Sequence, residues 1–224
     1  KNEAFRKSNL QGKELVRWKY QRYVKDYLRC VAAVDDGVGR ILESLDKLGL
    51  SENSIVIYSS DQGFYLGEHG WYDKRWIYEE SLKMPLVMRW PGKIEAGTKI
   101  KKLTQNIDFA PFFLEAAGAA VPDEIQGMCL MPLFKKKDAP WRKAIYYHYY
   151  EAGGHGVPAH FGVRDERYKL VHFPRTKEWN LVDLKKDPQE MQSFHEDPAY
   201  KETLDKMRAK LSDLQKKYGV ETSL

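Results

Sequence analysis

Apolar and aromatic residues recur at a spacing of three and four between residues 12 and 48. The positions are Tyr20, Tyr23, Val24, Tyr27, Leu28, Val31, Val34, Val38, Ile41, Leu42, Leu45 and Leu48. This spacing predicts one long amphipathic helix of roughly eight turns. Gly37 and Gly39 are the positions where it could bend, and Gly49 is placed to end it in the left-handed conformation.

Residues 55–58 are a continuous apolar run of strand length, and residues 85–90, which include Arg89, predict another buried strand. Such runs are typical of strands that are covered on both faces in a parallel sheet. Residues 51–54 predict a turn before the first run. Residues 107–118 predict a helix with Asp108 at its start and Gly118 beyond its end. Helix, turn and buried strand in succession indicate an α/β fold.

The pattern changes after residue 134. Residues 135–140 form a polar linker, and residues 144–151, 161–173 and 179–184 predict antiparallel strands with a hairpin turn at residues 165–167. A last helix, residues 198–218, carries one apolar stripe. We therefore predict two parts, a main α/β portion at 1–134 and a small antiparallel-sheet subdomain with a terminal helix at 135–224.

Composition excludes several classes of protein. The 224 residues are 42% hydrophobic and 31% charged, which excludes a disordered or low-complexity chain. No apolar run approaches the roughly 18 residues of a membrane helix, so we expect no membrane insertion. The net charge of +5 is spread along the chain, which argues against a nucleic-acid partner and is compatible with an acidic substrate.

The first residues of the sequence contain no Met and no apolar leader, so we expect a fragment of a longer protein. Cys30 and Cys129 are the only cysteines, and their spacing is not that of a metal site. Two buried thiols are the favoured interpretation and a disulfide is the alternative, so the redox compartment stays open.

The first candidate site follows the apolar run at residues 55–58. Asp61-Gln62-Gly63 places a carboxylate beside a carboxamide, and hard oxygen ligands of this kind suit Ca²⁺ or Mg²⁺. The alternative is that Asp61 only caps a turn. The following dozen residues are richer in polar chemistry than a structural loop requires. Among them the Lys74 ammonium could neutralise a sulfate or phosphate.

An ordered set of motifs then carries a resemblance. The motifs are residues 27–36, Ser59-Ser60-Asp61-Gln62-Gly63, Leu66-Gly67-Glu68-His69-Gly70, Asp73-Lys74-Arg75, Tyr78-Glu79-Glu80, Met84-Pro85-Leu86, residues 106–111, Gly162-Val163-Arg164, Tyr168-Lys169-Leu170 and residues 183–190. In order and spacing, from about residue 18 to the end, they resemble the carboxyl-terminal half of a type I sulfatase of the alkaline-phosphatase-like superfamily. The likeness is closest to N-acetylglucosamine-6-sulfatase-like members.

The resemblance implies an alkaline-phosphatase-like α/β sandwich and the hydrolysis of sulfate esters of a carbohydrate. It implies that Asp61 and Gln62 are metal ligands, with Ca²⁺ as the metal and Mg²⁺ as the alternative, and that Lys74 contacts the sulfate. His69 on the same loop either supports the loop or contacts substrate. Asp35 and Asp36 resemble metal ligands in composition only, and we expect them on a helix surface or in polar contacts between helices.

The chain also departs from the family pattern. Type I sulfatases use a formylglycine made from the Cys of C-x-P-S-R, and neither Cys30 nor Cys129 stands in that motif. The resemblance implies that this nucleophile and the two early Asp ligands lie before residue 1, in an amino-terminal half that completes the site. It also implies a periplasmic, extracellular or lysosomal location.

A second candidate site lies in the predicted sheet. His148, His155, His160 and Arg164, with neighbouring tyrosines, gather around a Gly-rich loop at residues 153–156 and could form the pocket for a sugar. The alternative is that they are edge-strand aromatics and solvated histidines.

Two other functions stay open. One is a phosphoesterase or phosphomutase of the same superfamily, which Gln62 argues against because those enzymes usually place His ligands there. The other is a non-catalytic sulfatase relative that binds glycans.

Overall fold

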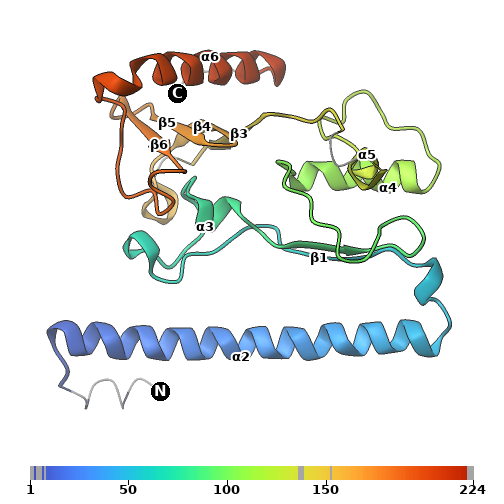
Figure 1. Cartoon of the computed structure of the whole chain (residues 1–224). Helices are drawn as coiled ribbons and strands as arrows, with labels where there is room; N and C mark the ends of the chain where they lie inside the picture. Colours follow the sequence, from blue (N-terminus) through green and yellow to red (C-terminus); the bar gives the residue numbers. More distant parts are fainter. Residues whose placement is uncertain (1–2, 4–6, 8, 136–138, 152, 221–224) are drawn as a thin grey trace.

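The structure is a computed structural model, which describes residues 3, 7, 9–135, 139–151 and 153–220. Its helices are α2 (Gly12–Lys47), α3 (Glu79–Leu82), α4 (Phe109–Ala116), α5 (Met131–Lys135) and α6 (Lys201–Lys217). Its strands are β1 (Val56–Ser59), β2 (Leu86–Arg89), β3 (Ala144–Tyr149), β4 (His160–Asp165), β5 (Tyr168–Phe173) and β6 (Glu178–Asp183). Figure 1 shows α2 along one side of the molecule and α6 on the opposite side.

The long amino-terminal helix is confirmed. α2 continues through Gly37 and Gly39, and Gly49 follows its end with a φ of +68°. The Leu50 N–H donates to the Leu45 carbonyl at 2.9 Å, which completes the turn that such a glycine permits. None of the α2 residues is buried. On its apolar face, Tyr23 contacts Tyr72 and Tyr27 contacts Phe64, both in the loop after β1.

The direction of the first two strands differs from the prediction. β1 and β2 pair antiparallel, with Val56 opposite Arg89 and Ser59 opposite Leu86. Tyr58 and Val87 stand opposite each other and are 43% and 63% exposed, so this pair is not covered on both faces in the described residues. An apolar run indicates burial but carries no information about strand direction, which the hydrogen-bond ladder decides.

A first core gathers around α4. Phe112, Leu130 and Leu133 are buried there, and Ile57 of β1 and Met88 of β2 pack against them. The predicted helix is confirmed as a 3₁₀ turn, η3 (Asn106–Asp108), that continues into α4. Gly118 follows with a φ of +71°.

A second core lies between the four-stranded sheet and α6. The strands are antiparallel, as the sequence predicts, and they lie in the order β3-β4-β5-β6. Asp165 closes the predicted β4–β5 turn by accepting the N–H groups of Arg167 and Tyr168. The buried residues of this core are Phe161, Val163, Leu170, Leu181, Phe194, Tyr200, Leu204, Met207 and Leu211. Lys136 and Lys137 of the predicted linker lie outside the described residues.

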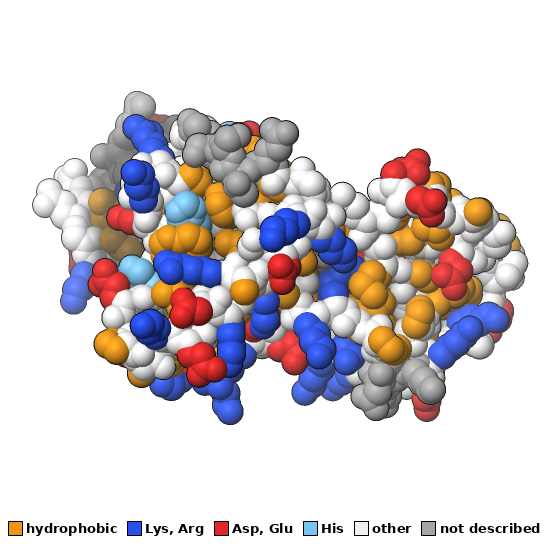
Figure 2. Space-filling model, turned by 90° about the horizontal axis from the view of Figure 1, so that it is seen from above, with side chains coloured by type: hydrophobic (Ala, Val, Ile, Leu, Met, Phe, Trp, Pro, Cys, Tyr) orange, Lys and Arg blue, Asp and Glu red, His pale blue; other side chains and the backbone are white. Residues whose placement is uncertain are grey.

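On the face seen from the α6 side, acidic and basic side chains are interspersed (Figure 2). Within the described residues, no helix is both long enough and apolar enough to span a bilayer.

Candidate active site

The loop after β1 is fixed by the short helix α3. The Gln62 amide nitrogen donates to the Lys74 carbonyl at 2.9 Å and to the Ser81 hydroxyl at 2.5 Å. The Ser81 hydroxyl in turn donates to the Lys74 carbonyl at 2.6 Å. Gln62 and the backbone of Lys74 are therefore joined to each other and to one residue of α3.

Gly63 has to be a glycine for a steric reason. Its N–H donates to the Ser81 carbonyl at 2.8 Å, and a Cβ at this position would lie 2.0 Å from the Glu80 carbonyl oxygen. No other residue fits so close an approach of two backbones. The third residue of Asp61-Gln62-Gly63 is thus explained by packing against α3.

Asp61 and Lys74 place an anion beside a cation at the surface. The Lys74 Nζ lies 3.6 Å from the Asp61 carboxylate, and these side chains are 41% and 83% exposed. The Asn106 amide holds the backbone of Asp61 by donating to its carbonyl at 2.9 Å. A metal ion on the Asp61 carboxylate and an anion on the Lys74 ammonium would therefore be neighbours.

The donor chemistry suits part of a hard-cation site. The amide nitrogen of Gln62 makes both hydrogen bonds above, so the carbonyl oxygen at the other end of the amide is not used in them. Ca²⁺ takes about six to eight oxygen ligands. No group of three or more His, Cys, Asp or Glu side chains in the described part of the chain could hold a metal. The residues present fit two ligands of such an ion, not a complete set.

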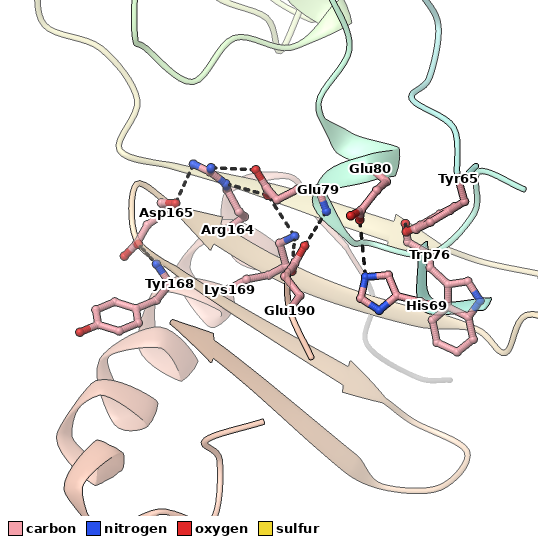
Figure 3. Close-up of polar contacts among 10 residues, drawn as sticks. All are labelled: Tyr65, His69, Trp76, Glu79, Glu80, Arg164, Asp165, Tyr168, Lys169 and Glu190. Carbon is pink, nitrogen blue, oxygen red and sulfur yellow. Dashed lines mark hydrogen bonds and ion pairs between the residues drawn. The ribbon is translucent and has the colours of Figure 1, made fainter. Parts of the chain in front are cut away.

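His69 lies inside the loop. Its ring stacks on Tyr78 with centroids 4.3 Å apart, its Nε2 lies 3.6 Å from the Glu80 carboxylate, and its side chain is 9% exposed. Figure 3 shows His69 directed toward Glu80 of α3. Its contacts in the structure are those of a residue that supports the loop.

The four residues of the predicted sugar pocket do not meet on one face of the sheet. His160 has no exposed surface, stacks on Trp76 and Tyr147, and has its Nδ1 2.9 Å from the Pro158 carbonyl. His148 stacks instead on Tyr150 and contacts Phe161, on the face toward α6. His155 is exposed in the turn at Gly154–Gly156 with a φ of +58°.

Arg164 is engaged by another part of the chain. Its guanidinium forms two hydrogen bonds to the Glu79 carboxylate, at 3.2 and 3.0 Å.

Burial lowers the pKa of both His148 and His160, which keeps the two rings neutral at neutral pH. The sequence predicts no role for Glu79 or Ser81, because only the fold brings their partners to them.

Two family descriptions match this sequence. The family described as Sulfatase matches residues 1–119, and the family described as N-sulphoglucosamine sulphohydrolase, C-terminal, matches residues 67–217. The chain belongs to the sulfatase family. The resemblance drawn from the motifs is confirmed.

Individual relatives agree with this assignment. An N-acetylglucosamine-6-O-sulfatase of Bacteroides thetaiotaomicron is 47% identical over 219 residues, which are 96% of this chain and 39% of the relative. A solved structure of a protein in complex with its substrate, D-glucosamine-2-N,6-O-disulfate, matches with a TM-score of 0.94 and 45% identity. The match covers 98% of this chain and 46% of that one.

A phosphonate monoester hydrolase of Agrobacterium radiobacter has a related structure, with a TM-score of 0.75 and 28% identity over 84% of this chain and 40% of that one. These matches confirm the predicted fold class. The chain spans between 39% and 46% of the length of the three relatives.

Membership of the sulfatase family suggests a metal ion and a formylglycine.

Both cysteines are free thiols, but Cys30 is exposed on α2, so the prediction of two buried thiols is wrong for Cys30. The reason is that this face of α2 is open in the described chain. Burial, with a hydrogen bond to Glu115, raises the pKa of Cys129 to about 11, so this thiol stays protonated at neutral pH.

Proposed function

We propose that this chain is the carboxyl-terminal part of a sulfatase that hydrolyses the sulfate ester of a carbohydrate, with sulfated glucosamine as the substrate class. The observation that carries the proposal is the Asp61, Gln62 and Lys74 arrangement in a member of the sulfatase family. The substrate class is supported by the names of two relatives, a sulfatase of N-acetylglucosamine and a protein solved with a disulfated glucosamine.

Each residue of the arrangement has a proposed role. Asp61 and Gln62 would hold Ca²⁺, or Mg²⁺ in its place, and the bound ion would stabilise negative charge on the sulfate oxygens. Lys74 would contact the sulfate with its ammonium, a compact positive charge. The formylglycine nucleophile and the remaining ligands would come from an amino-terminal part. Hereafter "full-length protein" means that part together with this chain.

Two observations support a larger protein. The chain spans 39% of the length of the N-acetylglucosamine-6-O-sulfatase that it matches. The apolar face of α2 also leaves Val16, Leu28 and Ile41 between 56% and 66% exposed, and such a face is typical of an interface. Family resemblance supports a periplasmic, extracellular or lysosomal location.

We also propose that the chain is organised as 1–134 and 135–224. The two separate cores support this division, with the refinement that Ala139 and Trp141 pack on the first core.

A second candidate function is hydrolysis of a phosphonate or phosphate ester, which the likeness to the phosphonate monoester hydrolase favours. A non-catalytic glycan-binding relative is a third. Assays of the full-length protein on matched sulfate and phosphonate esters, with metal analysis, separate the three. Faster turnover of the sulfate ester and bound Ca²⁺ support the sulfatase.

The 224-residue chain alone should show no sulfatase activity. Neither Cys30 nor Cys129 stands in a formylglycine motif, so the chain has no route to a covalent sulfated intermediate. The measurement is release of sulfate from an aryl sulfate in the presence of Ca²⁺, with the full-length protein as the positive control. Turnover by the chain above that of its heat-denatured form would refute this assignment.

Replacing His155 and His160 singly by Ala tests whether the sheet reads the sugar. If either ring contacts sugar hydroxyls, kcat/KM of the full-length protein should fall much more for a sulfated glucosamine than for a small aryl sulfate, by on the order of tenfold or more. His155 is the exposed member, whereas His160 is buried. Equal losses on both substrates would assign the residue to folding, and no loss would exclude it from substrate contact.

A further inference from the structure

Four charged side chains from four separate segments meet beneath α3. They are Glu79 at the start of α3, Arg164 on β4, Lys169 on β5 and Glu190 in the loop between β6 and α6 (Figure 3). Lys169 has no exposed surface, and Glu190 is 4% exposed. Each stands in one of the motifs that carry the resemblance to sulfatases, and among the four only Arg164 is a predicted site residue.

The cluster holds both the side chain and the backbone of Glu79. The Glu79 carboxylate contacts the Arg164 guanidinium and the Lys169 Nζ, the latter at 3.0 Å. Glu190 contacts Lys169 Nζ at 2.7 Å with one carboxylate oxygen and accepts the Glu79 N–H at 2.6 Å with the other. An N–H in the first turn of a helix has no acceptor within the helix. Glu190 supplies the acceptor for the Glu79 N–H.

The charges of this cluster balance among themselves. Two cations face two carboxylates. Burial works to raise the pKa of Glu79, but the nearby Lys169 and Arg164 outweigh it and hold the pKa below its ordinary value. Lys169 and Glu190 are buried, and the positive charge of the cluster is already matched. The cluster is therefore poorly suited to bind an anionic substrate directly. Its effect must therefore pass through the residues that it holds.

Glu79, which the cluster holds, is two positions before Ser81, and Ser81 contacts the candidate active site. Ser81, 1% exposed, receives the Gln62 amide and donates to the Lys74 carbonyl, and its own carbonyl accepts the Gly63 N–H. α3 has only four residues. A single helical turn has no length over which to absorb a displacement of Glu79 before it reaches Ser81.

We propose that Lys169 and Glu190 are positioning residues of the active site. They fix α3 from the side of the sheet, and α3 sets the positions of Gln62 and Lys74. The loop that carries Gln62 and Lys74 thereby depends on β5 and on the loop before α6. This inference rests on the proposed function.

Glu190→Met and Glu190→Gln in the full-length protein test the proposal. Met removes the acceptor for the Glu79 N–H, whereas Gln keeps an oxygen that can accept it. We expect Glu190→Met to lower kcat on a sulfated glucosamine and to weaken Ca²⁺ binding, measured by chelator competition, each by about tenfold or more. Glu190→Gln should retain more of both than Glu190→Met does.

Asp183→Asn is the matched control. Asp183 is a buried carboxylate of the same sheet, paired with Arg167 and Tyr200 and not with α3. The Asp183→Asn substitution should lower Tm. It should leave kcat and Ca²⁺ affinity within about twofold of the wild-type values at a temperature where the protein is folded. The proposal is overturned if folded Glu190→Met stays within the same limits, or if Asp183→Asn loses as much of both.

Two further measurements cover the remaining outcomes. If Glu190→Met does not fold, Lys169→Met/Glu190→Met removes both charges together and leaves neither partner unpaired. We expect the double variant to lose kcat and Ca²⁺ affinity to the same extent as Glu190→Met. If the wild type hydrolyses no sulfate ester, the proposed function fails while the positioning role is read from hydrogen exchange of residues 60–82. Protection there should fall in Glu190→Met and not in Asp183→Asn, and equal protection in both overturns the inference.

Discussion

Replacing Arg142 by Met should lower the free energy of unfolding by about 3 to 5 kcal/mol, the range found when one partner of a buried ion pair is removed. The Arg142 guanidinium contacts both oxygens of the Asp108 carboxylate at 2.5 Å. The Asp108 side chain has no exposed surface and that of Arg142 is 8% exposed. Without the guanidinium, Asp108 would keep a buried charge that the N–H groups of Gln105 and Met128 compensate only in part.

The loss should be visible in urea unfolding of the full-length protein followed by tryptophan fluorescence, because Trp141 adjoins Arg142 and donates to the Leu103 carbonyl at 2.7 Å. Lys206→Met provides the control. Lys206 pairs with Glu202 on the surface of α6, and removal of such an exposed pair should leave the midpoint unchanged. A loss for Arg142→Met no larger than that of the control would show that the Asp108 pair does not stabilise the protein.

Local patterns predicted the parts of the fold that local interactions determine. α2 and its glycine stop follow from the three-four spacing, and the β4–β5 turn follows from Asp165 accepting nearby N–H groups. The antiparallel pairing of β1 and β2 could not be predicted in this way. Both directions bury the same apolar residues, and the choice depends on the 26 residues between the strands.

In the candidate site, too, the sequence predicts contacts between residues that are close in sequence and misses contacts between residues that are far apart. Asp61, Gln62 and Lys74 lie within 14 residues of one another, and a motif could connect them. Glu79 and Glu190 are 111 positions apart, and only the packing of the sheet against α3 brings them together. The register of β3 and β4 pairs Tyr149 with His160, so strand alternation places His148 and His160 on opposite faces of the sheet.

Lys74→Ala should separate the sulfate contact from the metal contact in the full-length protein. Lys74 reaches the site through its ammonium alone, since its carbonyl is the group bonded to Gln62 and Ser81. Alanine keeps that carbonyl, so bound metal should remain close to the wild-type amount. Loss of one electrostatic stabiliser should remove about 2 to 4 kcal/mol of transition-state stabilisation, seen as a fall in kcat/KM.

Asp61→Ala is the complementary variant, because it removes a proposed metal ligand and should lower both metal content and kcat/KM. Lys93→Ala is the matched lysine control. Lys93 follows β2 beyond Arg89, at the end of the strand pair opposite to Ser59 and Asp61, and it is exposed. Unchanged kcat/KM in Lys74→Ala would refute the sulfate contact. A fall in bound metal as large as that in Asp61→Ala would instead place the Lys74 ammonium in support of the metal ligands, because its neighbour 3.6 Å away is the Asp61 carboxylate.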